Sequence, residues 1–144
     1  SIACYATAIK ERAKWDDPSR MLRIDFEIEI TWTEVFKIIG ATIFSGSVSD
    51  AAVQNAIGRM FFELVQKTPK LLPATEMRTR YVEKCQVVSS SLQKIKFQFM
   101  ALGYVTMQKI ERPGHSPQKQ WALTDLGESE ARRHAAIRRS NLSQ

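Results

Sequence analysis

Residues 22–30 show the most regular hydrophobic pattern in the chain, a strict alternation of apolar and charged positions. A period of two puts successive side chains on opposite faces of a β-strand, so the pattern predicts a strand with one buried and one solvated face. The charged row would also discourage pairing with foreign strands. The apolar positions are Leu22, Ile24, Phe26, Ile28 and Ile30, and the charged ones are Arg23, Asp25, Glu27 and Glu29.

Two stretches after this strand have a helical period. Residues 32–44 repeat apolar side chains at spacings of three and four, and Thr31 with Glu34 matches the capping box that begins many helices. A second helix is expected from Asp50 to about residue 65. Gly58 lies inside it, at a cost of up to about 1 kcal/mol relative to alanine. We expect close approach of a neighbouring helix to explain this glycine.

The N-terminal residues 1–14 have apolar side chains at helical spacing, which predicts the end of a helix that begins upstream. Residues 15–19 read Trp-Asp-Asp-Pro-Ser, and the proline and the aspartates end a helix and favour a turn. We therefore interpret residues 1–19 as the end of an upstream helix and a linker. The missing initial methionine favours a fragment of a longer polypeptide. Residues 20–144 are predicted to form one domain with its own core.

Residues 68–88 interrupt the helical pattern. Two prolines and the lack of a clear period predict a surface insertion in the domain. Its last part, residues 81–88, fits either a helical extension or a short strand. The β-branched pair Val87-Val88 favours the strand.

Residues 89–127 combine a helix, two short strands and the start of another helix. Serines precede the first helix and can cap it, and Gly103 can adopt the left-handed conformation that ends it. Strands are predicted at residues 104–111 and 119–123, on either side of a loop rich in proline and glycine. A last helix is predicted over residues 125–139. The first helix has an apolar face made of Leu92, Ile95, Phe99 and Leu102.

Two short motifs in this stretch resemble the recognition helix and wing of winged helix-turn-helix proteins. They are Phe99-Met-Ala-Leu-Gly-Tyr-Val105 and Trp121-Ala-Leu-Thr-Asp-Leu-Gly127, in a region that covers roughly a quarter to a third of the chain. The resemblance implies an α+β winged helix with four to five helices. Its small antiparallel sheet would combine strand 22–30 with the wing strands 104–111 and 119–123. The residues expected to hold the wing and its corner are Leu102, Val105, Trp121 and Leu123.

The whole layout also resembles a C-terminal winged module that follows TIR-like domains in uncharacterised bacterial proteins. This second resemblance implies a regulatory or sensing part of a larger protein. Two features depart from a simple regulator. Residues 68–88 separate the second helix from the presumed recognition helix, where a helix-turn-helix has a short turn. Phe97 and Met100 stand where arginine or asparagine is expected, and aliphatic neighbours favour a core position for Phe97.

The formal net charge of +6 is concentrated near the C-terminus. Residues 89–144 contain 9 Lys and Arg against 4 Asp and Glu, whereas residues 1–88 contain 12 against 11. The excess therefore coincides with the presumed recognition helix, the wing and the last helix. This distribution favours an anionic partner, nucleic acid first, and a solvated basic tail is the alternative.

Candidate nucleic-acid-binding residues follow from this placement. Glutamine pairs with adenine, and lysine with guanine or a phosphate, when a helix enters the major groove. Wing cations contact the DNA backbone. The same side chains also fit a solvated helix face and a mobile loop, and the two arginines could instead pair with Glu128 and Glu130. The candidates are Gln93, Lys94, Lys96 and Gln98 on the helix, Arg112 and Lys119 on the wing, and Arg132 and Arg133 on the last helix.

Enzymatic activity finds little support in the sequence. It contains no glycine-rich phosphate loop and no Cys–His pair, so no catalytic residue, cofactor or metal site is predicted. Cys4 and Cys85 are interpreted as free buried thiols of a cytoplasmic protein, with a disulfide as the alternative. No apolar run approaches the roughly 18 residues of a membrane span, and no signal peptide is visible.

Two functions remain open. DNA binding through the helix, the wing and the last helix is the first. The second is a protein-interaction or oligomerisation module that binds another protein, an N-terminal domain of the same chain, or a second copy as a homodimer. Some winged helices serve only as interaction modules, so the fold does not decide between the two.

Overall fold

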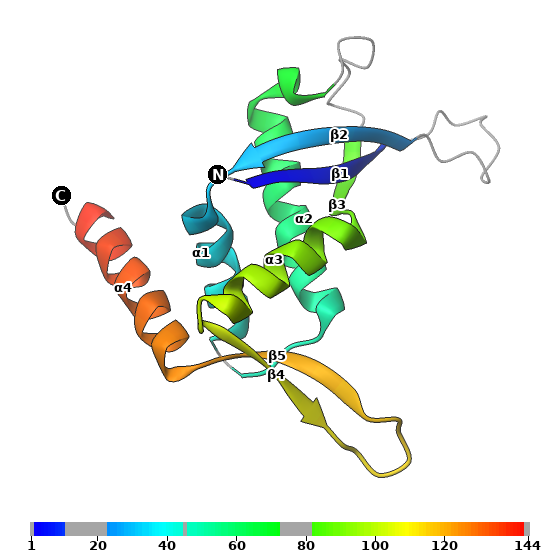
Figure 1. Cartoon of the computed structure of the whole chain (residues 1–144). Helices are drawn as coiled ribbons and strands as arrows, with labels where there is room; N and C mark the ends of the chain where they lie inside the picture. The colour runs from blue at the N-terminus through cyan, green and yellow to red at the C-terminus, as the bar shows by residue number, and fades with distance from the viewer. Residues whose placement is uncertain (1, 11–22, 45, 73–81, 143–144) are drawn as a thin grey trace. The chain divides into compact units, whose positions relative to one another are not determined.

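In the computed structural model, residues 2–10, 23–44, 46–72 and 82–142 are described (Figure 1). The fold is α+β, as the sequence predicts, and its helices and small two-stranded antiparallel sheet are consistent with a winged-helix-like layout. No helix in these four ranges is long and apolar enough to cross a membrane. In chain order the elements are β1 (Ile2–Lys10), β2 (Arg23–Ile30), α1 (Trp32–Ile43), α2 (Asp50–Lys67), the 3-10 turn η1 (Pro69–Leu71), β3 (Val82–Val87), α3 (Ser89–Ala101), β4 (Val105–Ile110), β5 (Gln118–Leu123) and α4 (Asp125–Leu142).

The chain divides into two compact units. The first, which we call the sheet unit, comprises Ser1–Trp32 and Gln54–Leu92. The second, the wing unit, comprises Thr33–Val53 and Gln93–Gln144. The chain passes between the units three times, and each crossing lies within a helix: after the first residue of α1, in the first part of α2 and in the first part of α3.

The sheet unit contains a three-stranded antiparallel sheet in the order β2-β1-β3 (Figure 1). Every second residue of β2 from Ile24 to Ile30 is buried, and the carboxylates between them are exposed, which confirms the alternation predicted for this strand. An apolar sheet face needs an apolar cover. The side chains buried from α2 within the same unit are Ala56, Ile57, Phe61 and Val65.

The helix predicted for residues 1–14 is wrong, because residues 2–10 form the central strand β1. The register places Cys4 opposite Ile28 and Ala8 opposite both Ile24 and Cys85. Small residues throughout this segment made a helical and an alternating pattern equally easy to fit. Pairing on both edges, which the local sequence does not encode, favours the strand. The linker proposed for residues 15–19 lies outside the described residues.

The predicted composition of the sheet is also wrong. Strand β2 pairs with β1, whereas the wing strands β4 and β5 form a separate two-stranded sheet. With residues 1–14 assigned to a helix, the strand at residues 22–30 lacked its actual partner and was assigned to the sheet of the wing. The two errors therefore have one cause.

The predicted surface insertion at residues 68–88 contributes a strand to the sheet. Its last part forms β3, as the β-branched pair favoured, and three of its side chains are buried: Val82, Cys85 and Val87. Helix α2 runs close to this strand, since Gln54 Nε2 donates to the carbonyl oxygen of Val87 at 3.0 Å. At Gly58, a Cβ would lie 2.5 Å from the carbonyl oxygen of Cys85. The close neighbour of Gly58 is thus a strand and not the helix predicted.

Phe36 lies at the centre of the wing unit's core. Its ring centroid is 5.3 Å from that of Phe99, 5.1 Å from that of Tyr104 and 6.0 Å from that of His134. These rings come from α1, α3, the turn after α3, and α4, so one side chain joins four segments. Tilted aromatic pairs at such distances contribute about 0.5–1.5 kcal/mol each beyond the area they bury.

The wing sheet is extended by one residue of the loop between α1 and α2. Val48 forms an isolated antiparallel bridge with Trp121, with N–O distances of 3.0 and 2.7 Å in the two directions. Ser47 Oγ also lies 2.7 Å from Gln120 Oε1, to which it donates. The wing is therefore tied at its base to the segment that leads into α2, and it projects from there (Figure 1).

Candidate nucleic-acid interface

Helix α3 has an apolar buried face and an exposed face. Leu92, Ile95 and Phe99 are buried, as their spacing predicts. Gly103 ends the turn after the helix with a φ of 77°, and Val105 is buried at the corner that follows. The exposed positions on the remaining surface are Ser89, Ser90, Lys94, Phe97, Met100 and Ala101.

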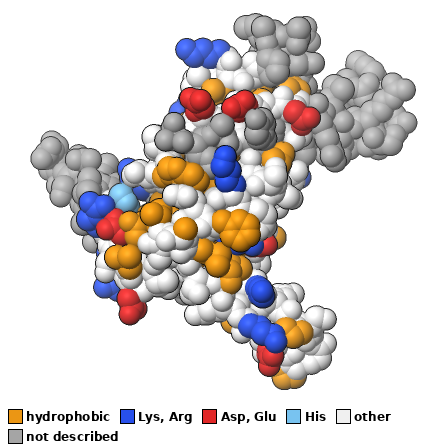
Figure 2. Space-filling model, viewed as in Figure 1, with side chains coloured by type: hydrophobic (Ala, Val, Ile, Leu, Met, Phe, Trp, Pro, Cys, Tyr) orange, Lys and Arg blue, Asp and Glu red, His pale blue; other side chains and the backbone are white. Residues whose placement is uncertain are grey.

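Two apolar side chains of this region are not where the sequence places them. Phe97 was expected in the core and is 64% exposed, and Leu102 was expected to anchor the corner and is 45% exposed. Ile95 and Phe99 already fill the inward face of the helix, and Phe97 lies two positions from each, on the opposite side. Leu102 follows the last helical residue, Ala101, so the helical period no longer orients its side chain. Hydrophobic side chains consequently gather on the face over α3 (Figure 2).

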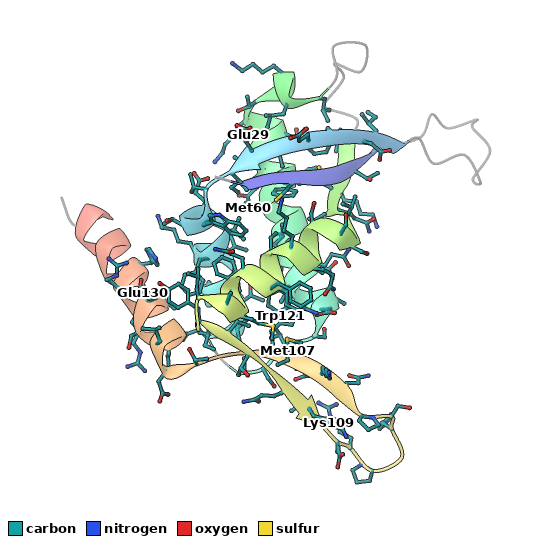
Figure 3. All side chains as sticks on the ribbon, viewed as in Figure 1. Glu29, Met60, Met107, Lys109, Trp121 and Glu130 are labelled. Carbon is teal, nitrogen blue, oxygen red and sulfur yellow. The ribbon has the colours of Figure 1, made fainter. Side chains whose placement is uncertain are left out.

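Lys96 is not on the open face predicted for it. Its side chain is 12% exposed, its Nζ lies 3.1 Å from a carboxylate oxygen of Asp50, and the same Nζ lies 5.5 Å from the centroid of the Trp121 ring. Trp121, at the base of the wing (Figure 3), donates its indole N–H to Asp50. We call these three side chains the wing-base cluster. It connects the first turn of α2, the middle of α3 and strand β5.

Asp50 is the polar centre of the wing-base cluster. Partial burial would raise the pKa of its carboxyl group, but the hydrogen bond from Trp121 and the hydrogen bond and charge of Lys96 outweigh burial and lower the pKa. The carboxylate also lies in the first turn of α2, where the helix dipole favours a negative charge. The sequence indicated Asp50 only as the start of a helix. No sequence signal paired it with Lys96 or Trp121, which lie 46 and 71 positions further along the chain.

The wing carries cations toward its tip. Arg112 and Lys119 are exposed and form no ion pair with a described residue, whereas Lys109 Nζ lies 3.4 Å from Glu111. Figure 3 shows Lys109 farther along the wing than Trp121. The turn between the strands closes through a 3.0 Å hydrogen bond from the His115 N–H to the Arg112 carbonyl oxygen. His115 is exposed.

The arginines of α4 are engaged in ion pairs along the helix. Arg132 lies 3.3 Å from Glu128, and Arg133 lies 2.7 Å from Glu130. The hydrogen bond and charge of Glu130 raise the pKa of Arg133 above its usual value. This arrangement matches the alternative in which these arginines pair with glutamates. Exposed pairs of this kind are weak, so both arginines can exchange a glutamate for a phosphate.

A tight corner joins the wing to α4. The Thr124 hydroxyl accepts a 3.0 Å hydrogen bond from the Gly127 N–H, and the Thr124 N–H donates to the Tyr104 carbonyl oxygen at 3.0 Å. A Cβ on Gly127 would collide with that same carbonyl oxygen. The Thr-x-x-Gly part of the sequence motif is thus explained by a helix cap at Thr124 and a close backbone approach at Gly127. Both residues serve the fold.

The predicted site residues differ in exposure and in pairing. Lys94, Arg112 and Lys119 are exposed cations of the wing unit without an ion pair to any described residue, and Gln93 and Gln98 are half-buried. Lys96, Arg132 and Arg133 are paired.

Other kinds of site are not visible in the part of the chain that the structure describes. It contains no group of three or more His, Cys, Asp or Glu side chains that could hold a metal ion, and every buried side-chain N or O atom there has a hydrogen-bond partner. Comparisons with protein-family models, with curated proteins and with solved structures found no match.

Proposed function

We propose that the wing unit binds duplex DNA, with α3 in the major groove and the wing along the backbone. The observation that carries the proposal is the set of exposed cations on these two elements that form no ion pair with a described residue: Lys94, Arg112 and Lys119. The wing unit as a whole has ten Lys and Arg against six Asp and Glu. A positive surface that presents a helix is the electrostatic and geometric footprint of a duplex-binding domain.

The proposed roles follow from the placement of each group. Lys94, on the exposed face of α3, would contact a base edge or a phosphate, and Gln93 would contribute beside it. Arg112 and Lys119 would contact phosphates and fix the register of the wing without reading sequence. The module would act in the cytoplasm as the regulatory or sensing part of a larger protein.

Binding to a generic duplex at different salt concentrations tests the proposal. Each phosphate contact adds about 0.9 to the slope of log affinity against log salt. Three contacts would therefore weaken binding about 40-fold between about 50 and 200 mM salt. A K94A/R112A/K119A variant should bind weakly at low salt and lose most of this salt dependence.

A charge-matched control is available in the sheet unit. Arg59, Lys70 and Lys84 are exposed there, and an R59A/K70A/K84A variant removes the same charge. Duplex affinity should change little in this control. Equal loss in both variants would mean that net charge alone attracts DNA, and absence of binding at about 50 mM salt would refute the proposed function.

A second candidate function, a protein-interaction module, is favoured by a different observation. Four large apolar side chains near the α3 face are substantially exposed: Phe97 at 64%, Met100 at 39%, Leu102 at 45% and Leu126 at 53%. Aromatic residues and methionine are enriched in the cores of protein interfaces. If no duplex is bound at low salt, sedimentation of the wild-type chain and of an F97A variant tests the homodimer, since loss of Phe97 should dissociate it.

A further inference from the structure

The centre of the exposed α3 face is apolar. Phe97, the most exposed large hydrophobic side chain in the described residues, is flanked by Met100 and Ala101 one helical turn later, both exposed. Lys94 lies one turn earlier. The helix that would enter the groove therefore presents a cation followed by an apolar surface.

Few polar groups of α3 remain to read bases. Lys96 is held in the wing-base cluster by Asp50 and Trp121, and Gln93 and Gln98 are half-buried. Readout by bidentate hydrogen bonds would need Arg, Asn or Gln at the exposed centre. This face carries Phe97 there instead.

Among the groups that base pairs present in the major groove, the C5-methyl of thymine is the apolar one. We propose that the apolar centre of the α3 face selects thymine-bearing base pairs, with Phe97 packed against C5-methyl groups. The inference rests on the proposed function and names the class of duplex that the same site prefers. Lys94, Arg112 and Lys119 would supply the phosphate contacts that hold the helix in place.

Helix geometry allows more than one methyl contact. A rise of about 1.5 Å per residue separates Phe97 and Ala101 by about 6 Å along the axis. Successive bases on one strand are spaced by about 3.4 Å. Phe97 and Ala101 therefore span roughly two base steps, which matches two thymines separated by one base on the same strand, as in an alternating A·T sequence.

Replacing thymine by deoxyuridine tests the inference directly. The substitution exchanges each C5-methyl for hydrogen and leaves base pairing and charge unchanged. Affinity is measured for an alternating A·T duplex and for the A·U duplex of the same length and order. Each buried methyl contributes a factor of about four, so two contacts should make the A·U duplex about 15-fold weaker.

Two variants separate methyl recognition from other effects of the exchange. In F97A the ratio between the A·T and A·U affinities should fall toward one, since the side chain that contacts the methyl is gone. Phe44 is the matched control, because it is 46% exposed in the same unit but lies at the end of α1, against Arg132. F44A should keep the wild-type ratio, and circular dichroism should show both variants folded.

The possible results have distinct meanings. A wild-type preference for thymine that F97A loses and F44A keeps supports the inference. Equal affinity for the two duplexes overturns it and leaves DNA binding in place, as does a preference that F97A retains. Absence of binding to both duplexes at low salt refutes the proposed function itself, and the exposed apolar face then belongs to a protein contact.

Discussion

At the scale of single residues, Gly58 shows a backbone contact that excludes any side chain. Helix α2 passes β3 so closely that a Cβ at this position would lie 2.5 Å from the Cys85 carbonyl oxygen. Because the obstacle is backbone of a sheet strand, it cannot move aside as a flexible side chain would.

Gly58→Ala should therefore destabilise the protein although alanine favours helices. The gain in helix propensity is at most about 1 kcal/mol, whereas forced displacement in a packed region costs about 1–3 kcal/mol. We expect a net loss of free energy of unfolding, measured by urea denaturation. Asn55→Ala, at an exposed position of the same helix, should be neutral or stabilising. A G58A variant as stable as the wild type would show that the strand can shift.

Asp50 makes a second residue-scale prediction, which concerns pH. Its folded-state pKa is lowered, so the carboxylate stabilises the fold above its unfolded pKa of about 3.9, and that contribution is lost as pH falls through the folded value. Asp50→Asn should be less stable than the wild type at neutral pH, because Lys96 keeps its charge but loses its partner. The gap in free energy of unfolding should close below about pH 4.

The control for Asp50 is Glu63, an exposed carboxylate on the same helix. Glu63→Gln should leave the free energy of unfolding nearly unchanged at every pH. A difference between Asp50→Asn and the wild type that stays constant from neutral to acidic pH would contradict the assignment of a charged Asp50 to the wing-base cluster.

The sequence predicted single residues well where one local rule decides their placement. Trp121 and Val105 are buried and Gly103 has positive φ, as the motif and the turn require. Phe97 could not be placed by composition, because an aromatic next to aliphatic residues fits either side of a helix. Lys96 was misplaced since its partner, Asp50, belongs to another element.

At the scale of elements, the corner between the wing and α4 depends on Thr124. Its hydroxyl caps the helix through the Gly127 N–H and donates to the Gly103 carbonyl oxygen. One side chain thereby connects the turn after α3 to the start of α4.

Thr124→Ala should cost about 1 kcal/mol of stability, the usual value for loss of an N-cap. Thermal or urea unfolding measures the change. Thr124→Ser keeps the hydroxyl and should recover most of the loss, whereas Ser129→Ala, at an exposed position of α4, should have little effect. If the serine variant were as unstable as the alanine variant, the methyl group and not the hydroxyl would be the important part of Thr124.

Elements with a strong period were predictable, and those stabilised by distant partners were not. Strand β2 and helices α1, α2 and α3 follow alternating or helical spacing and were found near the expected residues. Strand β1 has small residues that fit both periods, and its identity is decided by pairing with β2 and β3. The sequence of strand β3 also fitted a helix or a strand, and pairing with β1 decides its identity as well.

At the scale of the whole molecule, the two units contain different side chains whose signals can follow unfolding. The sheet unit contains both cysteines, which are buried, and burial raises the pKa of Cys85 to about 11. The wing unit contains Trp121, buried at the base of the wing. Each unit thus has its own probe of unfolding.

We expect the two units to unfold in one transition. Helices α2 and α3 each belong to both units, so unfolding of one unit would expose the other half of a continuous helix.

In a W15F/W32F variant, the fluorescence of the remaining Trp121 reports on the wing unit, while reaction of Cys4 and Cys85 with a thiol reagent reports on the sheet unit. Thiolate is the reactive form, so the native thiols should be protected both by burial and by the raised pKa of Cys85. The urea midpoints of the two probes should coincide. Thiols that react at lower urea than the fluorescence change would show that the sheet unit opens while the wing unit stays folded.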